Sequence, residues 1–349
     1  MKTCKKTIAS LFLLCLFLQP LSEVIAQNGG FAGSFTRMGF SPRGMAMGNA
    51  MSAVHQEGSY SYYNPALAAV RREHVMVDFS TAAMAFDRRL HTATAHFQLP
   101  PSAGLTFTLK NARVQDIDGR TVDGYHTDFL STNEFRLAGR FGIRFSDAFS
   151  GGIGITYSLA NYHTDVPNTG TVGLDIGFLI RLNPKLSLAV AAKDLLASYD
   201  FDTSNLYGTD QRADNAFNFP SRFIAGFAYE LSEKWLFSAD AELRLQSFQT
   251  ETISPGRDQF GEFTERIVLS ETNQTTYFRT GTRYHLHERI SVRGGIRFED
   301  IGGEATLLPS AGFSLMLPYD RFSPSIDYAF VREASQLTTM HVFALRLHL

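Results

Sequence analysis

Apolar residues alternate with polar or small ones along almost the whole chain, and this period of two limits the possible folds more than any other feature. In one stretch the apolar residues are Phe135, Leu137, Phe141, Ile143 and Phe145, and Arg136, Ala138, Arg140 and Arg144 lie between them. Successive side chains of an extended strand point to opposite faces, so this pattern predicts strands with one apolar face.

The pattern occurs in fourteen segments. We expect strands at 74–86, 89–98, 103–111, 133–145, 150–162, 171–183, 185–194, 221–231, 234–248, 274–286, 289–299, 305–317, 322–333 and 339–349. A tilted strand needs about nine to eleven residues to cross a bilayer, and bacterial barrels usually have an even number of strands. The sequence therefore predicts an all-β fold, a transmembrane antiparallel β-barrel of about fourteen strands over residues 73–349.

The connections alternate in length. Tight links are expected at 99–102, 146–149, 183–185, 232–234, 286–288 and 318–321, and longer or more polar loops at 112–132, 163–170, 195–220 and 249–273. Membrane barrels have short turns at the periplasmic end and long loops outside. A soluble β-sandwich has no reason to alternate in this way.

The first 26 residues have the features of a secretory signal peptide. Lys2, Lys5 and Lys6 precede an apolar run over 8–18, which is too short to span a membrane as a helix. Small side chains before Gln27 predict cleavage after Ala26. Export together with a barrel predicts location in the outer membrane of a Gram-negative bacterium.

Several classes of function are disfavoured. Both cysteines, Cys4 and Cys15, lie within the expected signal peptide, so the mature chain would lack disulfides and thiolate sites. The net charge of −2 does not suit a nucleic-acid partner. The histidines are scattered, and neither a Gly-x-Ser-x-Gly elbow nor a phosphate-binding loop is present. We therefore expect no enzyme activity, cofactor or metal.

The C-terminal segment and the glycines fit a barrel. Phe343, Leu345, Leu347 and Leu349 would share one face of the last strand, which resembles the signal read by the outer-membrane assembly machinery. That machinery and outer-membrane lipid are therefore expected partners. Glycine is frequent within strands, where it permits the bends that barrel closure requires.

Residues 27–72 interrupt the period and are predicted to form an N-terminal plug segment. This segment contains Arg43, Gly48 and, after three tyrosines, Asn64 and Pro65. An Asn before Pro favours a turn. We expect this dipeptide to turn the chain toward the first strand.

This signature, with Ala46, Ala50 and Tyr63-Asn64-Pro65-Ala66-Leu67, resembles the N-terminal signature of the PorV/PorQ family. The family belongs to the FadL-like barrel superfamily, whose fourteen strands and plug agree with the count made from periodicity. The chain departs from the family at His55-Gln56-Glu57, where acidic residues are common.

The resemblance implies two alternative functions. One is support of type IX protein secretion or surface attachment of cargo, with secretion-system proteins or cargo as partners. The other is FadL-like transport of a hydrophobic small molecule. Aromatic residues among the charges of the long loops favour the first slightly.

Charged residues are expected on the inner face of the barrel. The expected lumen charge network comprises Arg136, Arg140, Arg144, Asp175, Asp240, Glu242, Arg244, Arg279, Arg283, Arg293 and Arg297. One hypothesis is a lumen that prefers anions. The favoured alternative is an ion-paired interior that holds the plug, because buried charges must be paired.

Overall fold

The computed structural model describes residues 32–58, 60–71, 75–202, 215–258, 261–301, 304–317, 324–333 and 338–349. The expected signal peptide and the first five residues of the expected plug lie outside them. No helix in these ranges is long and apolar enough to cross a membrane.

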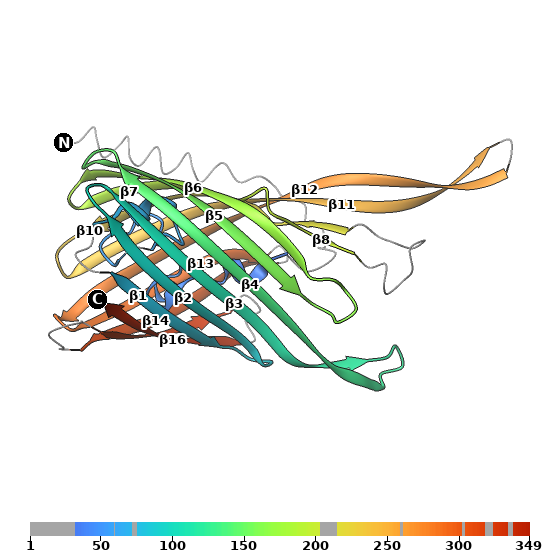
Figure 1. The fold of residues 1–349 in the computed structure, drawn as a ribbon, viewed down its shortest axis with the longest axis horizontal. Coiled ribbons are helices and arrows are strands. Elements are labelled where there is room, and N and C mark those ends of the chain that lie inside the picture. The colour runs from blue at the N-terminus through green and yellow to red at the C-terminus, as the bar shows by residue number, and fades with distance from the viewer. Residues whose placement is uncertain are drawn as a thin grey trace.

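The chain forms a closed antiparallel barrel of fourteen strands, so this prediction is confirmed (Figure 1). The strands are β1 (Met76–Ala83), β2 (Arg88–Leu99), β3 (Ala103–Arg120), β4 (His126–Arg144), β5 (Phe149–Asn161), β6 (Thr169–Asn183), β7 (Leu186–Leu195), β10 (Ser221–Glu230), β11 (Trp235–Asp258), β12 (Gly261–His287), β13 (Ile290–Ile301), β14 (Glu304–Met316), β15 (Ser325–Arg332) and β16 (Thr339–His348). A separate hairpin contains β8 (Ser198–Phe201) and β9 (Asn215–Asn218). Strand β1 closes the barrel against β16, from Met76 opposite His348 to Ala83 opposite His341.

The two faces of the wall differ as the alternation predicts. Leu137, Ile155 and Phe343 point outward and are about half exposed, at 53%, 60% and 50%. Arg140 and Asp175 point inward and are buried. The outer surface is thus an apolar belt, which a bilayer would cover.

Aromatic side chains gather on this belt near the short turns. Phe149 stacks between Phe145 and Phe178, with ring centroids 5.5 and 5.8 Å away, and Trp235 lies 4.6 Å from Tyr284. Aromatic girdles mark the interfacial zones of membrane barrels. The short turns and the C-terminus lie at this same end of the barrel (Figure 1).

The predicted loops at 112–132 and 249–273 are wrong, because both regions are strand. Strands β3 and β4 continue to a turn at 121–125, and β11 and β12 remain paired from Trp235 opposite Tyr284 to Asp258 opposite Gly261. Both hairpins project beyond the barrel (Figure 1). Outside a bilayer neither face of a strand is buried, so the period-two signal disappears although the pairing continues.

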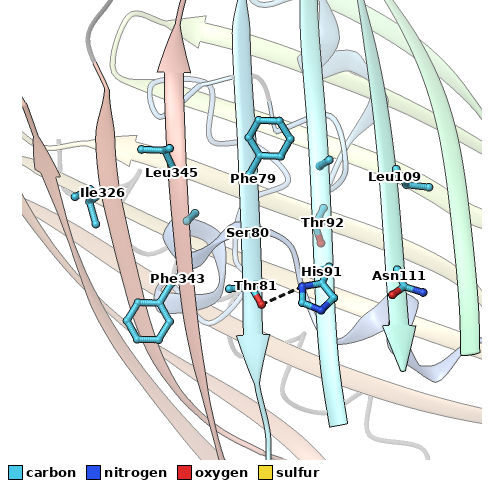
Figure 2. Close-up of a pocket in the computed structure, with 12 residues that line it drawn as sticks. Phe79, Ser80, Thr81, His91, Thr92, Leu109, Asn111, Ile326, Phe343 and Leu345 are labelled. Carbon is cyan, nitrogen blue, oxygen red and sulfur yellow. Dashed lines mark hydrogen bonds between the residues drawn. The ribbon is translucent and has the colours of Figure 1, made fainter. Parts of the chain in front are cut away.

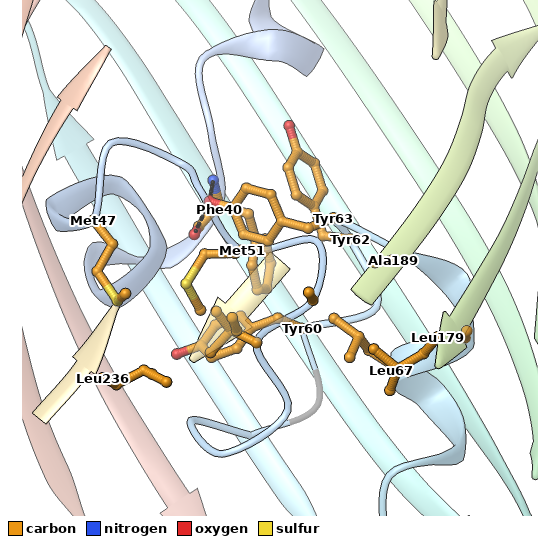
Figure 3. Close-up of a cluster of buried hydrophobic side chains, with 14 residues drawn as sticks. Phe40, Met47, Met51, Tyr60, Tyr62, Tyr63, Leu67, Leu179, Ala189 and Leu236 are labelled. Carbon is orange, nitrogen blue, oxygen red and sulfur yellow. Dashed lines mark hydrogen bonds between the residues drawn. The ribbon is translucent and has the colours of Figure 1, made fainter. Parts of the chain in front are cut away.

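The plug segment lies inside the barrel. It contains η1 (Ser34–Arg37), α2 (Ser41–Ala46) and η2 (Pro65–Ala69). Helix α2 contacts β13–β16 and β1, while η2 contacts β3–β6 on the other side of the lumen. Between them a buried cluster contains Phe40, Met47, Met51, Tyr60, Tyr62, Tyr63 and Leu67 (Figure 3).

Candidate functional site

The wall has a row of glycines where η2 approaches it. Gly104, Gly142, Gly152 and Gly177 lie directly opposite one another across β3, β4, β5 and β6. A Cβ at Gly152 would lie 2.4 Å from the carbonyl carbon of Pro65, and one at Gly104 would lie 1.9 Å from Ala68 O. The plug backbone therefore contacts the wall backbone directly, and any side chain on this row would displace it.

Asn64 holds the start of η2 against this row. Its Oδ1 accepts from Ala66 N at 3.0 Å, which caps the helix, and Pro65 follows at the first helical position. Its Nδ2 donates to Ser52 O at 3.1 Å and to Phe178 O on β6 at 3.0 Å. The Asn-Pro pair thus joins the plug to itself and to the wall, which no reasoning from turn propensity could reveal.

Gly48 occupies a similar position on the opposite side of the lumen. Its φ is +62°, and a Cβ there would lie 2.9 Å from Ile296 O. Its N–H donates to Ser310 Oγ at 3.2 Å. Gly295 of β13, directly opposite Gly281 of β12, leaves the space that Gly48 and Met47 fill. Only glycine fits these contacts.

Arg43 connects the plug to β15. Its Nε donates to both carboxylate oxygens of Asp327 at 3.0 Å, and its Nη2 donates to Ser325 Oγ at 2.7 Å. Nearby, Arg346 of β16 binds Asp78 Oδ2 at 2.9 Å, Glu57 O at 3.1 Å and the hydroxyl of Tyr60. The Arg43–Asp327 pair thus crosses the plug–wall boundary, whereas Arg346 pairs with Asp78 within the wall and also donates to Glu57 and Tyr60 of the plug.

Glu57 is shared by two arginines of the wall. Its Oε1 accepts from Arg283 Nη1 at 2.8 Å and its Oε2 from Arg293 Nη2 at 2.6 Å. Burial alone would raise the pKa of this plug carboxyl, but Arg293, Arg43 and Arg283 outweigh burial and hold the pKa well below its usual range. Glu57 is therefore ionised at neutral pH.

Two acidic side chains of β11 extend this network. Asp240 accepts from the N–H and the hydroxyl of Ser52 at 3.0 and 2.7 Å. Glu242 binds Arg279 at 2.6 Å and also pairs with Arg244. Asp240 thus holds the plug, whereas Glu242 joins neighbouring strands.

Positive charges gather around Tyr62 on the other side of the lumen. Lys193 Nζ and Lys110 Nζ lie 4.4 and 4.8 Å from its ring centroid, and Arg140 lies at 5.8 Å. Such contacts stabilise desolvated cations. Lys110 also donates to Phe35 O and Gly39 O at 3.1 and 2.7 Å. The plug therefore supplies carbonyl oxygens and a ring to the cations of the wall.

Asp194 pairs with both Arg136 and Arg222, although simple alternation places it on the outer face. A β-bulge sets Lys193 and Asp194 opposite the single residue Asp175, and Asp194 has a φ of +57°. Bulges re-aim side chains in this way. Both bulged residues are buried, at 2% and 0% exposure.

The structure separates the predicted charge network into parts. Arg136, Arg140 and Asp175 lie on the Tyr62 side, while Asp240, Glu242, Arg244, Arg279, Arg283 and Arg293 lie on the β11–β13 side. Arg297 pairs with Glu299 at 2.7 Å. Arg144 stands apart near the short-turn end, where its Nη2 donates to Pro101 O at 3.2 Å.

The sequence reasoning did not select Glu57, Asp78, Lys110 or Asp194. Alternation could have found two of them, because Asp78 lies between the apolar Val77 and Phe79, and Lys110 follows Leu109, which shares the outer face with Phe107. The bulge hid Asp194, and no periodic signal applies to Glu57 in the plug.

Part of the lumen is apolar. Ala329, Val342, Ala82, Leu90 and Ala112 are successive register partners across β15, β16, β1, β2 and β3. With Val331 and Met340 they pack against Phe35, Met38 and Met45 of the plug. We call the wall residues of this cluster the luminal apolar row: Ala329, Val342, Ala82, Leu90, Ala112, Val331 and Met340. Methionine in such a cluster adapts readily to different shapes.

A groove of about 620 Å³ lies on the outer side of the same strands (Figure 2). Phe79, Leu109, Phe343 and Leu345 give it an apolar lining, and His91 and Thr81 meet through a 3.0 Å hydrogen bond on its wall. The groove and the luminal apolar row therefore share β15, β16, β1, β2 and β3.

Within the described ranges, no group of three or more His, Cys, Asp or Glu side chains is placed to hold a metal ion. Apart from Arg144, the charges described above are mutually paired or bound to the plug.

Comparison with known proteins shows the fold. The Pseudomonas putida toluene transporter TodX superposes with a TM-score of 0.59 at 12% identity, over 93% of this chain and 98% of that one. The CymD monoaromatic hydrocarbon channel gives 0.53 at 14%, over 89% and 96%. A Pseudomonas aeruginosa FadL homologue gives 0.58 at 11%, over 88% and 97%.

No protein-family model matches the sequence, and no curated protein matches it. The solved structures show that the chain has the fold of FadL-type barrels. Assignment to the PorV/PorQ family stays a prediction.

Proposed function

We propose that the chain is an outer-membrane barrel that carries a hydrophobic small molecule past its plug. The observation that supports this most is the luminal apolar row. The row is an unbroken run of apolar residues across five adjacent strands in a lumen that carries many charges elsewhere, and an apolar lining of this kind suits an oily ligand. The whole-chain likeness to TodX and CymD, whose names refer to toluene and monoaromatic hydrocarbons, favours the same function.

The contacts of the row suggest how a ligand would enter. The plug covers the row mainly with Phe35, Met38 and Met45. Methionine side chains can change rotamer without breaking hydrogen bonds, so a small apolar molecule could replace them against the wall. The outer groove gives the same strands an apolar surface on the lipid side. In this proposal the charge network holds the plug and does not select anions.

A pair of substitutions at one position tests the proposal. Met340→Asp puts a carboxylate into the row, while Met340→Leu keeps the row apolar at similar volume. Whole cells of a Gram-negative host that express each variant are given toluene at low concentration, and its uptake is measured. We expect Met340→Leu to support uptake and Met340→Asp to fall to the level of cells without the barrel. Equal uptake by both variants, with equal amounts of folded barrel, would contradict the proposal.

One observation favours the second candidate, support of protein secretion or surface attachment. From Phe248 opposite Glu271 to Asp258 opposite Gly261, β11 and β12 pair only with each other among the described strands. This ribbon is about 33 Å long at the usual rise per residue. Its two free edges could each accept an extended peptide.

Replacing 248–271 by a two-residue Asn-Gly turn separates the two functions. Secretion or attachment of cargo in a host that carries such a system would be lost if the ribbon binds the partner, while toluene uptake would continue. If uptake is lost and secretion persists, the ribbon belongs to transport and the second candidate fails.

A further inference from the structure

A polar pocket of about 340 Å³ opens beside the end of the plug, near the short-turn end of the barrel. Ala69, Val70 and Arg71, the residues that end and follow η2, form one side. Ser150 and Leu179 of the wall form another, and both are buried. The pocket lies apart from the luminal apolar row and from the ion pairs that hold the plug.

Three arginines from separate parts of the chain line this pocket. Arg71 follows η2 near the end of the plug segment, Arg144 ends β4 and Arg181 lies near the end of β6. Among the described residues no carboxylate pairs with any of the three, whereas most luminal arginines bind one. The side chain of Arg144 donates to the carbonyl oxygen of Pro101 at 3.2 Å.

The charge of the pocket is strongly positive. Asp147, in the turn between β4 and β5, is its one acidic lining residue; three arginines less one aspartate leave a charge of +2, and His55 also lines the pocket. Guanidinium groups are planar forks of N–H donors that match the oxygens of phosphate. A phosphate monoester carries a charge of about −1.5 to −2 at neutral pH, which complements this excess.

We propose that this pocket binds a phosphate group and thereby bridges the end of the plug to the barrel wall. Arg71 would contact the phosphate from the plug, and Arg144 and Arg181 from the wall. A bound phosphate would then hold Arg71 and the end of η2 against the wall. Two sources share this chemistry, a phosphate-bearing solute of the periplasm and the headgroup of an anionic phospholipid.

Binding is measured with inorganic phosphate on the full barrel in a zwitterionic detergent, by calorimetric titration at constant ionic strength maintained with chloride. We expect one saturable site per chain. The double variant Arg144→Gln/Arg181→Gln should bind phosphate at least about tenfold more weakly, because two charge-assisted contacts are lost. Lys185→Gln is the matched control, since Lys185 lies exposed in the neighbouring β6–β7 turn and does not line the pocket.

Asp147→Asn gives the decisive result. Removing the one carboxylate should strengthen phosphate binding, and a substitution that merely damages the fold does not do that. Heat-modifiable migration on SDS gels verifies that each variant is a closed barrel. The proposal would be overturned if phosphate showed no saturable binding in the chloride buffer. It would also be overturned if the double variant and Lys185→Gln bound phosphate with equal affinity.

Repeating the titration in nanodiscs identifies the source. If phosphatidylglycerol nanodiscs weaken phosphate binding and phosphatidylcholine nanodiscs do not, the headgroup occupies the pocket. If neither competes, the occupant is a soluble phosphate compound. Toluene uptake is not measured in this test, so the proposed phosphate site and the proposed transport function can each be refuted independently of the other.

Discussion

Asp194 lies in the bulge of β7, opposite Asp175 of β6, and its backbone N–H donates to an Asp175 carboxylate oxygen at 2.9 Å. The bulge turns Asp194 inward next to Asp175, so that two carboxylates lie within reach of Arg136, Arg140 and Arg222. A single irregular residue thereby balances part of the positive charge around Tyr62.

Asp194→Asn should destabilise the barrel because it leaves Arg136 and Arg222 buried without their shared carboxylate. Loss of one partner of a buried ion pair costs about 3–5 kcal/mol. The expected result is a lower urea midpoint in detergent, followed by circular dichroism. Asp165→Asn is the control, because Asp165 is exposed and its carboxylate makes only a long contact, 3.7 Å, with His163 Nδ1. Equal urea midpoints for the two variants would refute this role of Asp194.

Glu57→Gln should make the barrel less stable at neutral pH and change how its stability depends on pH. The pKa of Glu57 is lower in the folded state, so its ionisation adds stability above the unfolded pKa of about 4.3, and that stability is lost as the pH falls further. The difference in unfolding free energy between wild type and variant should be full at pH 7 and shrink below about pH 4. The exposed Glu233→Gln serves as the control, and a difference independent of pH would argue against ion pairing at Glu57.

Gly152→Ala should loosen the plug without preventing barrel closure. The added Cβ would lie 2.4 Å from Pro65, so η2 must move, and such overpacking costs about 1–3 kcal/mol. Faster hydrogen exchange at 64–69 and a larger ion conductance in planar bilayers are the expected readouts. Gly294→Ala is matched to it, since no atom lies within 4 Å of its Cβ position. Identical exchange in both variants would show that the glycine row does not seat the plug.

Labelling of whole cells tests the orientation. The only cysteines, Cys4 and Cys15, lie in the expected signal peptide, so an introduced cysteine would be the sole one in the mature chain. Asp118→Cys lies on the long β3–β4 hairpin and should react with an impermeant thiol reagent, whereas Glu233→Cys in a short turn should not. The opposite labelling pattern would show that the barrel has the reverse orientation in the membrane.

The period of two was enough to predict fourteen strands, their approximate bounds and the inner face that carries Arg140 and Asp175. One-sided burial produces that period, and it is a local property of each strand. The same reasoning ended β3 and β11 too early and began β4 and β12 too late, because strands that leave the bilayer lose one-sided burial. Alternation also could not find Asp194, because a bulge changes parity without a periodic signal.

The motif around Asn64 and Pro65 marked the plug, and its sequence alone indicated a turn. Only the tertiary structure showed why glycines lie where they do: Gly104, Gly142, Gly152 and Gly177 are far apart in sequence, but strand register aligns them under η2. The same register assembles the luminal apolar row from Ala82, Leu90 and Val342. Periodicity thus determined which face each strand turns inward, whereas closure of the barrel decided which of those faces meet, since contact between distant strands depends on register and not on local sequence.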